Sequence, residues 1–338
     1  METDFEKEEE KGGQKYAELL CDFMFKRLFG SEVNKDVLIG FLNMLLDDVV
    51  IDDVDFIPTE HPGLTEEDRK VIFDISCRCK DGKSFIIEMQ KGYQKHFRER
   101  ALYYTTYPIN GQGRMAQEEF VRKKAENGDE GKFKWDYDLK PVIVVAILNF
   151  KFEHQRDWPA DRYHSSYRIR EDFSQEVMTD ALRFVFLELG RFNKRIWELE
   201  TVFDKWMYLL KHMHEMVEIP DKFSDPLFKR LFLLAKIGKF TAEEYEQYQK
   251  SLTNMGDYDN IINTAVEEAE KRGREVGRAE GEAKGRAEGR AEGRTEGRTE
   301  GRNEAIAETV KKFLLLGVDI ETISKATGLD IGAIESLK

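Results

Sequence analysis

The stretch FDISCRCKDGKSFIIEMQ, residues 73 to 90, alternates apolar and polar residues on both sides of a short polar segment. Such alternation predicts two β-strands, and the segment between them predicts a hairpin turn. A two-residue turn made of Asp81 and Gly82 would set Lys80 opposite Lys83. A three-residue loop that starts at Lys80, with Gly82 in the left-handed position, shifts the pairing by one residue and avoids this contact. The sequence therefore favours the three-residue loop.

This loop decides which side chains share a face of the hairpin. It gathers the apolar residues on one face, where Phe73 is expected opposite Met89. On the other face it sets Asp74 opposite Glu88, and Gln90 lies on this same face. Two carboxylates with Cβ atoms about 5 Å apart repel each other. A proton or a hard divalent cation relieves the repulsion, and Mg²⁺ prefers carboxylate and water ligands. The other interpretation is a solvated polar face, in which the acids bond to a neighbouring arginine or to water.

The composition is that of a highly charged globular chain of 338 residues, with 41% hydrophobic and 35% charged residues. A net charge of -13 argues against a protein that coats nucleic acid by bulk electrostatics, so a DNA contact needs a local basic patch. The three cysteines form no CxxC pair, which indicates a reducing compartment. No apolar run of about 18 residues occurs, so we expect a cytoplasmic protein without a membrane partner.

The order of the expected elements predicts an α/β fold with a mixed sheet. A helical period then continues from 171 to about 250, and it predicts helices that pack on this core. The elements expected before it are helices at 16–30 and 34–48, a strand at 49–57, the hairpin at 70–90, an amphipathic helix at 93–109 and a doubly buried strand at 140–150.

A glycine recurs at every fourth residue from Gly273 to Gly301, with arginine and glutamate repeating at the same interval. As an isolated helix this segment is marginal, because each glycine costs about 1 kcal/mol relative to alanine and like charges stack at i, i+4. One interpretation is a flexible or fraying charged tether. The other is self-association through residues 273–304, where the arginine stripe of one helix meets the glutamate stripe of another.

The C-terminal residues 305–338 predict three short helices, with Asp319 and Asp330 as N-caps and Gly328 in a tight turn. This pattern is similar to a small helix-turn-helix unit. Its last helix offers few donors for bases or phosphates, so two interpretations stay open, DNA reading and a packing or assembly module.

Four blocks in order resemble the PD-(D/E)XK nuclease family transposases, also called recombination-promoting nucleases. The likeness runs over about residues 16 to 150. The signature of this family is an Asp on one strand and Glu-x-Gln on the next, and Asp74, Glu88 and Gln90 match it. The resemblance implies a restriction-endonuclease-like core. The blocks are DFMFKRLFG, LIGFLNMLLDD, FDISCRCKDGKSFIIEMQ and RERALYYTTYPINGQ.

With this resemblance the chain is expected to have five parts. They are an acidic disordered leader at 1–15, a PD-(D/E)XK nuclease core at 16–170, a helical extension at 171–255, a charged tetrapeptide-repeat helix or linker at 256–304 and a small helical unit at 305–338.

The resemblance also implies a metal site. Asp74 and Glu88 would hold Mg²⁺, with Mn²⁺ as a substitute, helped by the main-chain carbonyl of Met89, and Asp22 is a candidate for an additional acid. The ion would polarise a phosphodiester oxygen and lower the pKa of an attacking water. Gln90 stands where most PD-(D/E)XK enzymes have lysine. An amide cannot take up a proton, but it can orient the water or donate to a phosphoryl oxygen.

Basic residues after the hairpin supply the local patch that the acidic total requires. We expect Lys91, Lys95, Arg98 and Arg100 to contact nucleic acid together with Tyr104, which lies four residues after Arg100 on one helix face. The alternative for the tyrosine is core packing, because an aromatic ring buries a large apolar area.

The sequence thus predicts a Mg²⁺-dependent DNA endonuclease that acts in recombination or on mobile elements. One alternative is a catalytically weak DNA-binding or assembly protein in which the nuclease core is a scaffold. Another is an RNA-cleaving nuclease, which would use the same metal chemistry.

Overall fold

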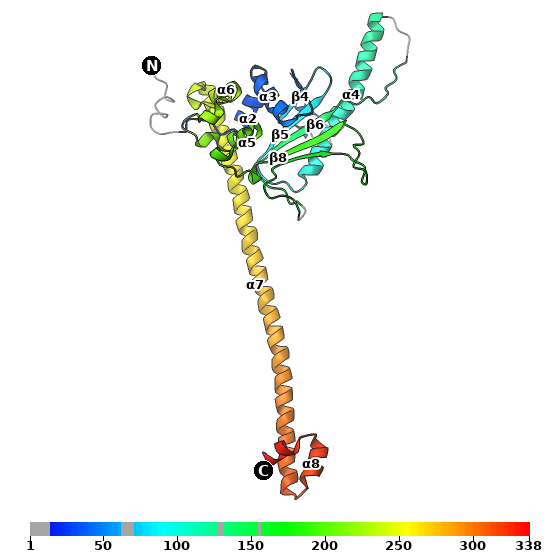
Figure 1. Cartoon of the computed structure of the whole chain (residues 1–338), viewed down its shortest axis with the longest axis vertical. Coiled ribbons are helices and arrows are strands. Elements are labelled where there is room, and N and C mark those ends of the chain that lie inside the picture. Colours follow the sequence, from blue (N-terminus) through cyan, green and yellow to red (C-terminus); the bar gives the residue numbers. More distant parts are fainter. Residues whose placement is uncertain (1–13, 62–70, 128–131, 155–156) are drawn as a thin grey trace. The chain divides into compact units, whose positions relative to one another are not determined.

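The computed structural model describes residues 14–61, 71–127, 132–154 and 157–338 (Figure 1). The expected leader at 1–15 lies almost entirely outside the described residues. The chain divides after Asn260 into two compact units. The first contains a six-stranded sheet with helices on both faces, and the second is helical.

The sheet is mixed, and its strands follow the order β1-β4-β5-β6-β8-β7. The central strands β5, β6 and β8 run parallel, whereas β1, β4 and β7 join by antiparallel pairing. A separate small sheet pairs β2 with β3. The strands are β1 (Asp55–Phe56), β2 (Glu60–His61), β3 (Val71–Ile72), β4 (Ile75–Arg78), β5 (Ser84–Gln90), β6 (Val142–Leu148), β7 (His164–Arg168) and β8 (Leu182–Glu188).

Helices cover the two faces of the sheet unequally. One apolar cluster joins one face to α2 (Asp22–Phe29), α3 (Lys35–Leu45), α5 (Val202–His212) and α6 (Pro226–Ala235). A smaller cluster joins the other face to α4 (Phe97–Asn127), which crosses the sheet in Figure 1. Every residue of β6 is buried between these layers, so the predicted α/β mixed-sheet core is confirmed. Short 3-10 helices lie at Glu32–Asn34, Leu189–Arg191, Ile196–Glu198, Met213–Glu215, Asp221–Phe223 and Ile237–Lys239.

The hairpin between β4 and β5 has the predicted register. Cys77 pairs with Phe85, and beyond them the Cys79 N–H donates to the Lys83 carbonyl at 2.8 Å. Three residues therefore remain in the loop. Gly82 has φ +91°, a left-handed conformation that side chains with a Cβ atom rarely adopt.

The chain bends at Asp74, between β3 and β4, and the register does not extend past Ile75. Phe73 consequently turns to the α4 side of the sheet, where its ring lies 5.2 Å from that of Tyr104. The expected position of Phe73 opposite Met89 is wrong. The Asp74 side chain accepts a hydrogen bond from the Met89 N–H instead of continuing the ladder.

The expectation of helix from residue 171 onward is also wrong at its start. Residues 182–188 form β8, which pairs with β6 along its whole length, so the sheet continues beyond the expected end of the core at 170. The apolar residues of LRFVFLE fit a buried helix as well as a buried strand, so their pattern does not distinguish the two. The pairing with β6 makes this segment a strand. Helices do follow from Ile196.

The charged repeat is helical throughout. It lies in α7 (Ala242–Leu315), and residues 273–304 are exposed. The charged tether and self-association both stay predictions. No helix in the described part of the chain is both long and apolar enough to span a bilayer.

The C-terminal residues form the expected helix-turn-helix arrangement. α8 (Ile320–Thr327) is capped by Asp319, and α9 (Ile331–Glu335) is capped by Asp330. Gly328 ends α8 with φ +73°. A small core of Val310, Ile323 and Ile334 holds this end of α7 to the two short helices.

Candidate active site

Two carboxylates lie together at the end of the hairpin. The bend puts Asp74 just before β4, and Glu88 is near the end of β5. The Asp74 N–H donates to Glu88 Oε1 at 3.2 Å, and the Met89 N–H donates to Asp74 Oδ2 at 2.7 Å. Glu88 is only 2% exposed. The predicted juxtaposition of Asp74 and Glu88 is therefore present, although main-chain bonds at a bend produce it and not a ladder pair.

Burial and mutual repulsion disfavour the charged forms of this pair. Burial, and then the charge of Asp74, raises the pKa of Glu88 to about 8. Burial also raises the pKa of Asp74, against the opposing effect of the Met89 N–H bond. Without a cation the pair therefore retains a proton near neutral pH.

Gln90 and Arg100 complete the immediate surroundings of Glu88. The Gln90 Nε2 donates to Glu88 Oε2 at 3.2 Å, because residues two apart on a strand share a face. From α4, Arg100 Nη2 lies 3.7 Å from the same oxygen. The Arg100 guanidinium also lies 5.3 Å over the Tyr104 ring and hydrogen-bonds to Gln94. One cation and one amide thus face the carboxylate pair.

A family model for PD-(D/E)XK nuclease family transposases matches residues 19–265. The chain belongs to this family. The match contains the whole sheet, helices α2 to α6 and the beginning of α7. Neither the curated proteins nor the solved structures that were searched include a match.

PD-(D/E)XK nucleases generally use divalent metals, and the donors present in this chain fit such an ion. Among the described residues, no group of three or more His, Cys, Asp or Glu side chains is arranged to hold a metal. Asp74 and Glu88 nevertheless offer two adjacent carboxylates whose repulsion a cation would relieve. Mg²⁺ is commonly held by one or two carboxylates together with water and substrate phosphate.

Asp22 lies close enough to the carboxylate pair for its charge to act on Asp74. Its side chain is 63% exposed and pairs with Lys26 at 2.9 Å. The Asp22 charge contributes to the raised pKa of Asp74, and the Lys26 charge opposes it. A role for Asp22 as an additional acid stays a prediction.

The basic residues expected to bind nucleic acid occupy different surroundings. Arg100 and Tyr104 lie at the carboxylates, as described above. Lys91 pairs with Asp259 of α7 at 3.0 Å, and the Arg98 guanidinium lies 4.5 Å over the Phe152 ring. Lys95 is exposed and makes no hydrogen bond or ion pair within the part of the chain that the structure describes. Their binding to nucleic acid stays a prediction.

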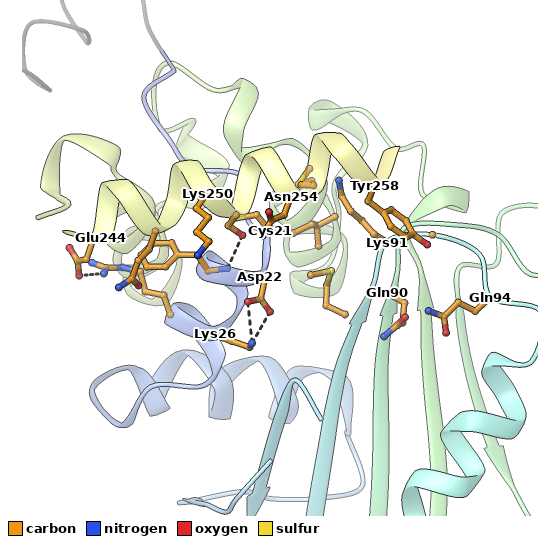
Figure 2. Close-up of a pocket in the computed structure, with 18 residues that line it drawn as sticks. Cys21, Asp22, Lys26, Gln90, Lys91, Gln94, Glu244, Lys250, Asn254 and Tyr258 are labelled. Carbon is orange, nitrogen blue, oxygen red and sulfur yellow. Dashed lines mark hydrogen bonds and ion pairs between the residues drawn. The ribbon is translucent and has the colours of Figure 1, made fainter. Parts of the chain in front are cut away.

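Sequence reasoning missed a pocket beside the carboxylates, shown in Figure 2. It has a volume of about 770 Å³, and its walls come from α2, the end of β5 and the α7 segment 244–258. Gln90 lies on its wall. The periodicity of α7 predicts a helix face but not the partner of that face, so no sequence signal pointed to this pocket.

Proposed function

We propose that this chain is a Mg²⁺-dependent nuclease that hydrolyses phosphodiester bonds of DNA, in recombination or on mobile elements. Family membership supports nuclease activity. The observation that carries the proposal is the buried contact between Asp74 and Glu88, with the pKa of Glu88 raised to about 8. Burying two repelling carboxylates together does not help a sheet to fold. An ion site explains the pair, because a bound cation would relieve the repulsion.

The side chains have distinct parts in this chemistry. The chemistry that a divalent ion supplies when bound is polarisation of a phosphodiester oxygen and a lower pKa of water. Asp74 and Glu88 would hold the ion, together with the Met89 carbonyl. Gln90 is placed to donate a hydrogen bond to a phosphoryl oxygen or to orient water. Arg100 offsets negative charge beside Glu88.

Cleavage assays test this function directly. The purified chain is expected to nick supercoiled plasmid DNA with Mg²⁺ or Mn²⁺ and to leave it intact with EDTA or Ca²⁺, because Ca²⁺ binds oxygen ligands with a looser geometry. RNA of the same sequence serves as the second substrate. If the chain cleaves RNA and not DNA, its substrate is RNA and the DNA part of the proposal is wrong. DNA binding in EDTA without cleavage by any ion would favour the catalytically weak binding or assembly protein.

A substitution at Gln90 separates ion holding from catalysis. We expect Gln90→Ala to slow cleavage about tenfold, since one hydrogen bond to a charged group contributes about 1.5 kcal/mol. Stabilisation by Mg²⁺ in thermal melts should persist, because Asp74 and Glu88 remain. Gln117→Ala is the matched control, an exposed amide of α4 that lies outside the carboxylate site and the pocket. Equal rates for Gln90→Ala and the parent chain would remove Gln90 from the mechanism.

A further inference from the structure

The pocket beside the carboxylates shares a wall with the proposed active site. Gln90 belongs both to this wall and to the hydrogen-bonded group around Glu88. The charges of Asp22 and Lys26, which also line the pocket, act on the pKa of Asp74. A ligand in the pocket therefore lies next to the position of a scissile phosphate.

Cations outnumber acids around this pocket, in a chain whose net charge is -13. Lys26 pairs with Asp22, but both side chains are more than half exposed, so a phosphate can replace this weak pair. Lys250 projects from α7 and has no ion pair or hydrogen bond among the described residues. The remaining cations are Arg27, which pairs with Glu244, and Lys91, which pairs with Asp259.

Amide, apolar and aromatic side chains also line the pocket. This mixture suits nucleotides, because cations bind phosphates, amides bind base edges and apolar or aromatic groups contact base faces. A pocket of about 770 Å³ is in the size range of small-ligand sites and too small to enclose a duplex. The residues are Gln90, Gln94, Gln247 and Asn254 among the amides, and Phe23, Met255 and Tyr258 among the apolar and aromatic groups.

Close contacts fix the α7 wall of the pocket against the end of β5. The Lys91 Nζ lies 3.0 Å from Asp259. A Cβ atom added at Gly92 would lie 2.4 Å from the Tyr258 hydroxyl, so a larger residue there would require the Tyr258 side chain to move. This wall is therefore packed against the strand from which Glu88 and Gln90 project.

We propose that the pocket binds an unpaired, single-stranded segment of the nucleic-acid substrate next to the cut site, with Lys26 and Lys250 contacting its phosphates. The inference rests on the proposed nuclease function and names its substrate class, a nucleic acid with unpaired nucleotides beside the scissile bond. A duplex with a single-stranded flap is accordingly cut faster than a blunt duplex of the same sequence.

Binding of the full chain to a fluorescein-labelled 12-nucleotide DNA in EDTA, followed by anisotropy over a salt series, tests the site without cleavage. Lys250 is the residue to change, because the Lys26 charge also acts on Asp74. We expect Lys250→Gln to reduce the slope of log K against log salt by about 0.7, the loss of one phosphate contact on a single strand. Lys250→Glu should weaken binding by about tenfold or more. Lys229→Gln, an exposed lysine of α6 outside the pocket, is the control and should match the parent.

The results separate this site from the nuclease proposal. Unchanged affinity and slope in Lys250→Gln would overturn the strand site, even if the parent chain cuts DNA. Binding of a mononucleotide by the parent without binding of the 12-mer would also overturn it, in favour of a free nucleotide as ligand. Binding of the 12-mer that depends on Lys250 supports the site. If the chain then cleaves no DNA with any metal ion, that result counts against the nuclease function and not against the strand site.

Discussion

Glu88→Gln is expected to reduce metal-dependent cleavage about a thousandfold. The substitution removes one of two carboxylates that would hold the ion, and the ion contributes several kcal/mol to transition-state stabilisation. A loss of about 4 kcal/mol corresponds to roughly three orders of magnitude in rate. The measurement is the initial rate of plasmid nicking with Mg²⁺ and with Mn²⁺.

The same substitution should leave the fold intact, which separates a catalytic role from a structural one. A glutamine amide can accept the Asp74 N–H through its oxygen, and its nitrogen then faces Gln90, whose amide can turn to present its own oxygen. The neutral side chain also removes the burial cost that raises the pKa of Glu88. At pH 8 in EDTA, Glu88→Gln should therefore melt no lower than the parent chain.

Glu119→Gln is the matched control for this experiment. Glu119 belongs to α4 and lies outside the carboxylate site and the pocket, and its side chain is 54% exposed, so we expect cleavage at the rate of the parent chain. Parent-like cleavage by Glu88→Gln would place the activity elsewhere, in other residues or in a contaminating nuclease. A folded, inactive Glu88→Gln beside an active Glu119→Gln is the expected pattern.

The residues of the hairpin predict its loop and its register, but they do not predict how its first strand begins at Asp74. Gly82 and the lysines around it predicted the loop, because a wrong turn length would have paired like charges and mixed the two faces. The bend at Asp74 escaped the same reasoning, since alternation assumes that a ladder continues. The Asp74 carboxylate instead bonds to the Met89 N–H, and this contact brings it to Glu88.

Contacts between residues far apart in the chain could not be predicted from the sequence. The β8 run is apolar at spacings that suit a helix or a strand, and only its place beside β6 decides between them. Lys91 was assigned to a basic patch, whereas its partner Asp259 lies 168 residues away. Neither residue carries a signal for the other, so the pocket beside the carboxylates could not be predicted.

The stability of the metal-free chain is expected to fall as the pH rises from about 5 to 8. The pKa of Glu88 rises from an ordinary 4.5 to about 8 in the folded chain, so folding favours the protonated form. Its contribution to stability is complete below 4.5 and is lost as the pH approaches 8. One retained proton gives a slope of up to about 1.4 kcal/mol per pH unit. Urea unfolding in EDTA across this range measures the slope.

Mg²⁺ should reverse this loss, because the ion binds the ionised pair and has to displace its proton. Stabilisation by a fixed excess of Mg²⁺ is therefore expected to grow between pH 6 and pH 8. Glu88→Gln should show a shallower slope in EDTA and little stabilisation by Mg²⁺, while Glu119→Gln keeps both effects. Stabilisation that is independent of pH and persists in Glu88→Gln would mean that the ion binds elsewhere. The raised pKa values of Asp74 and Glu88 would then reflect burial and nearby negative charge in a pair that holds no ion.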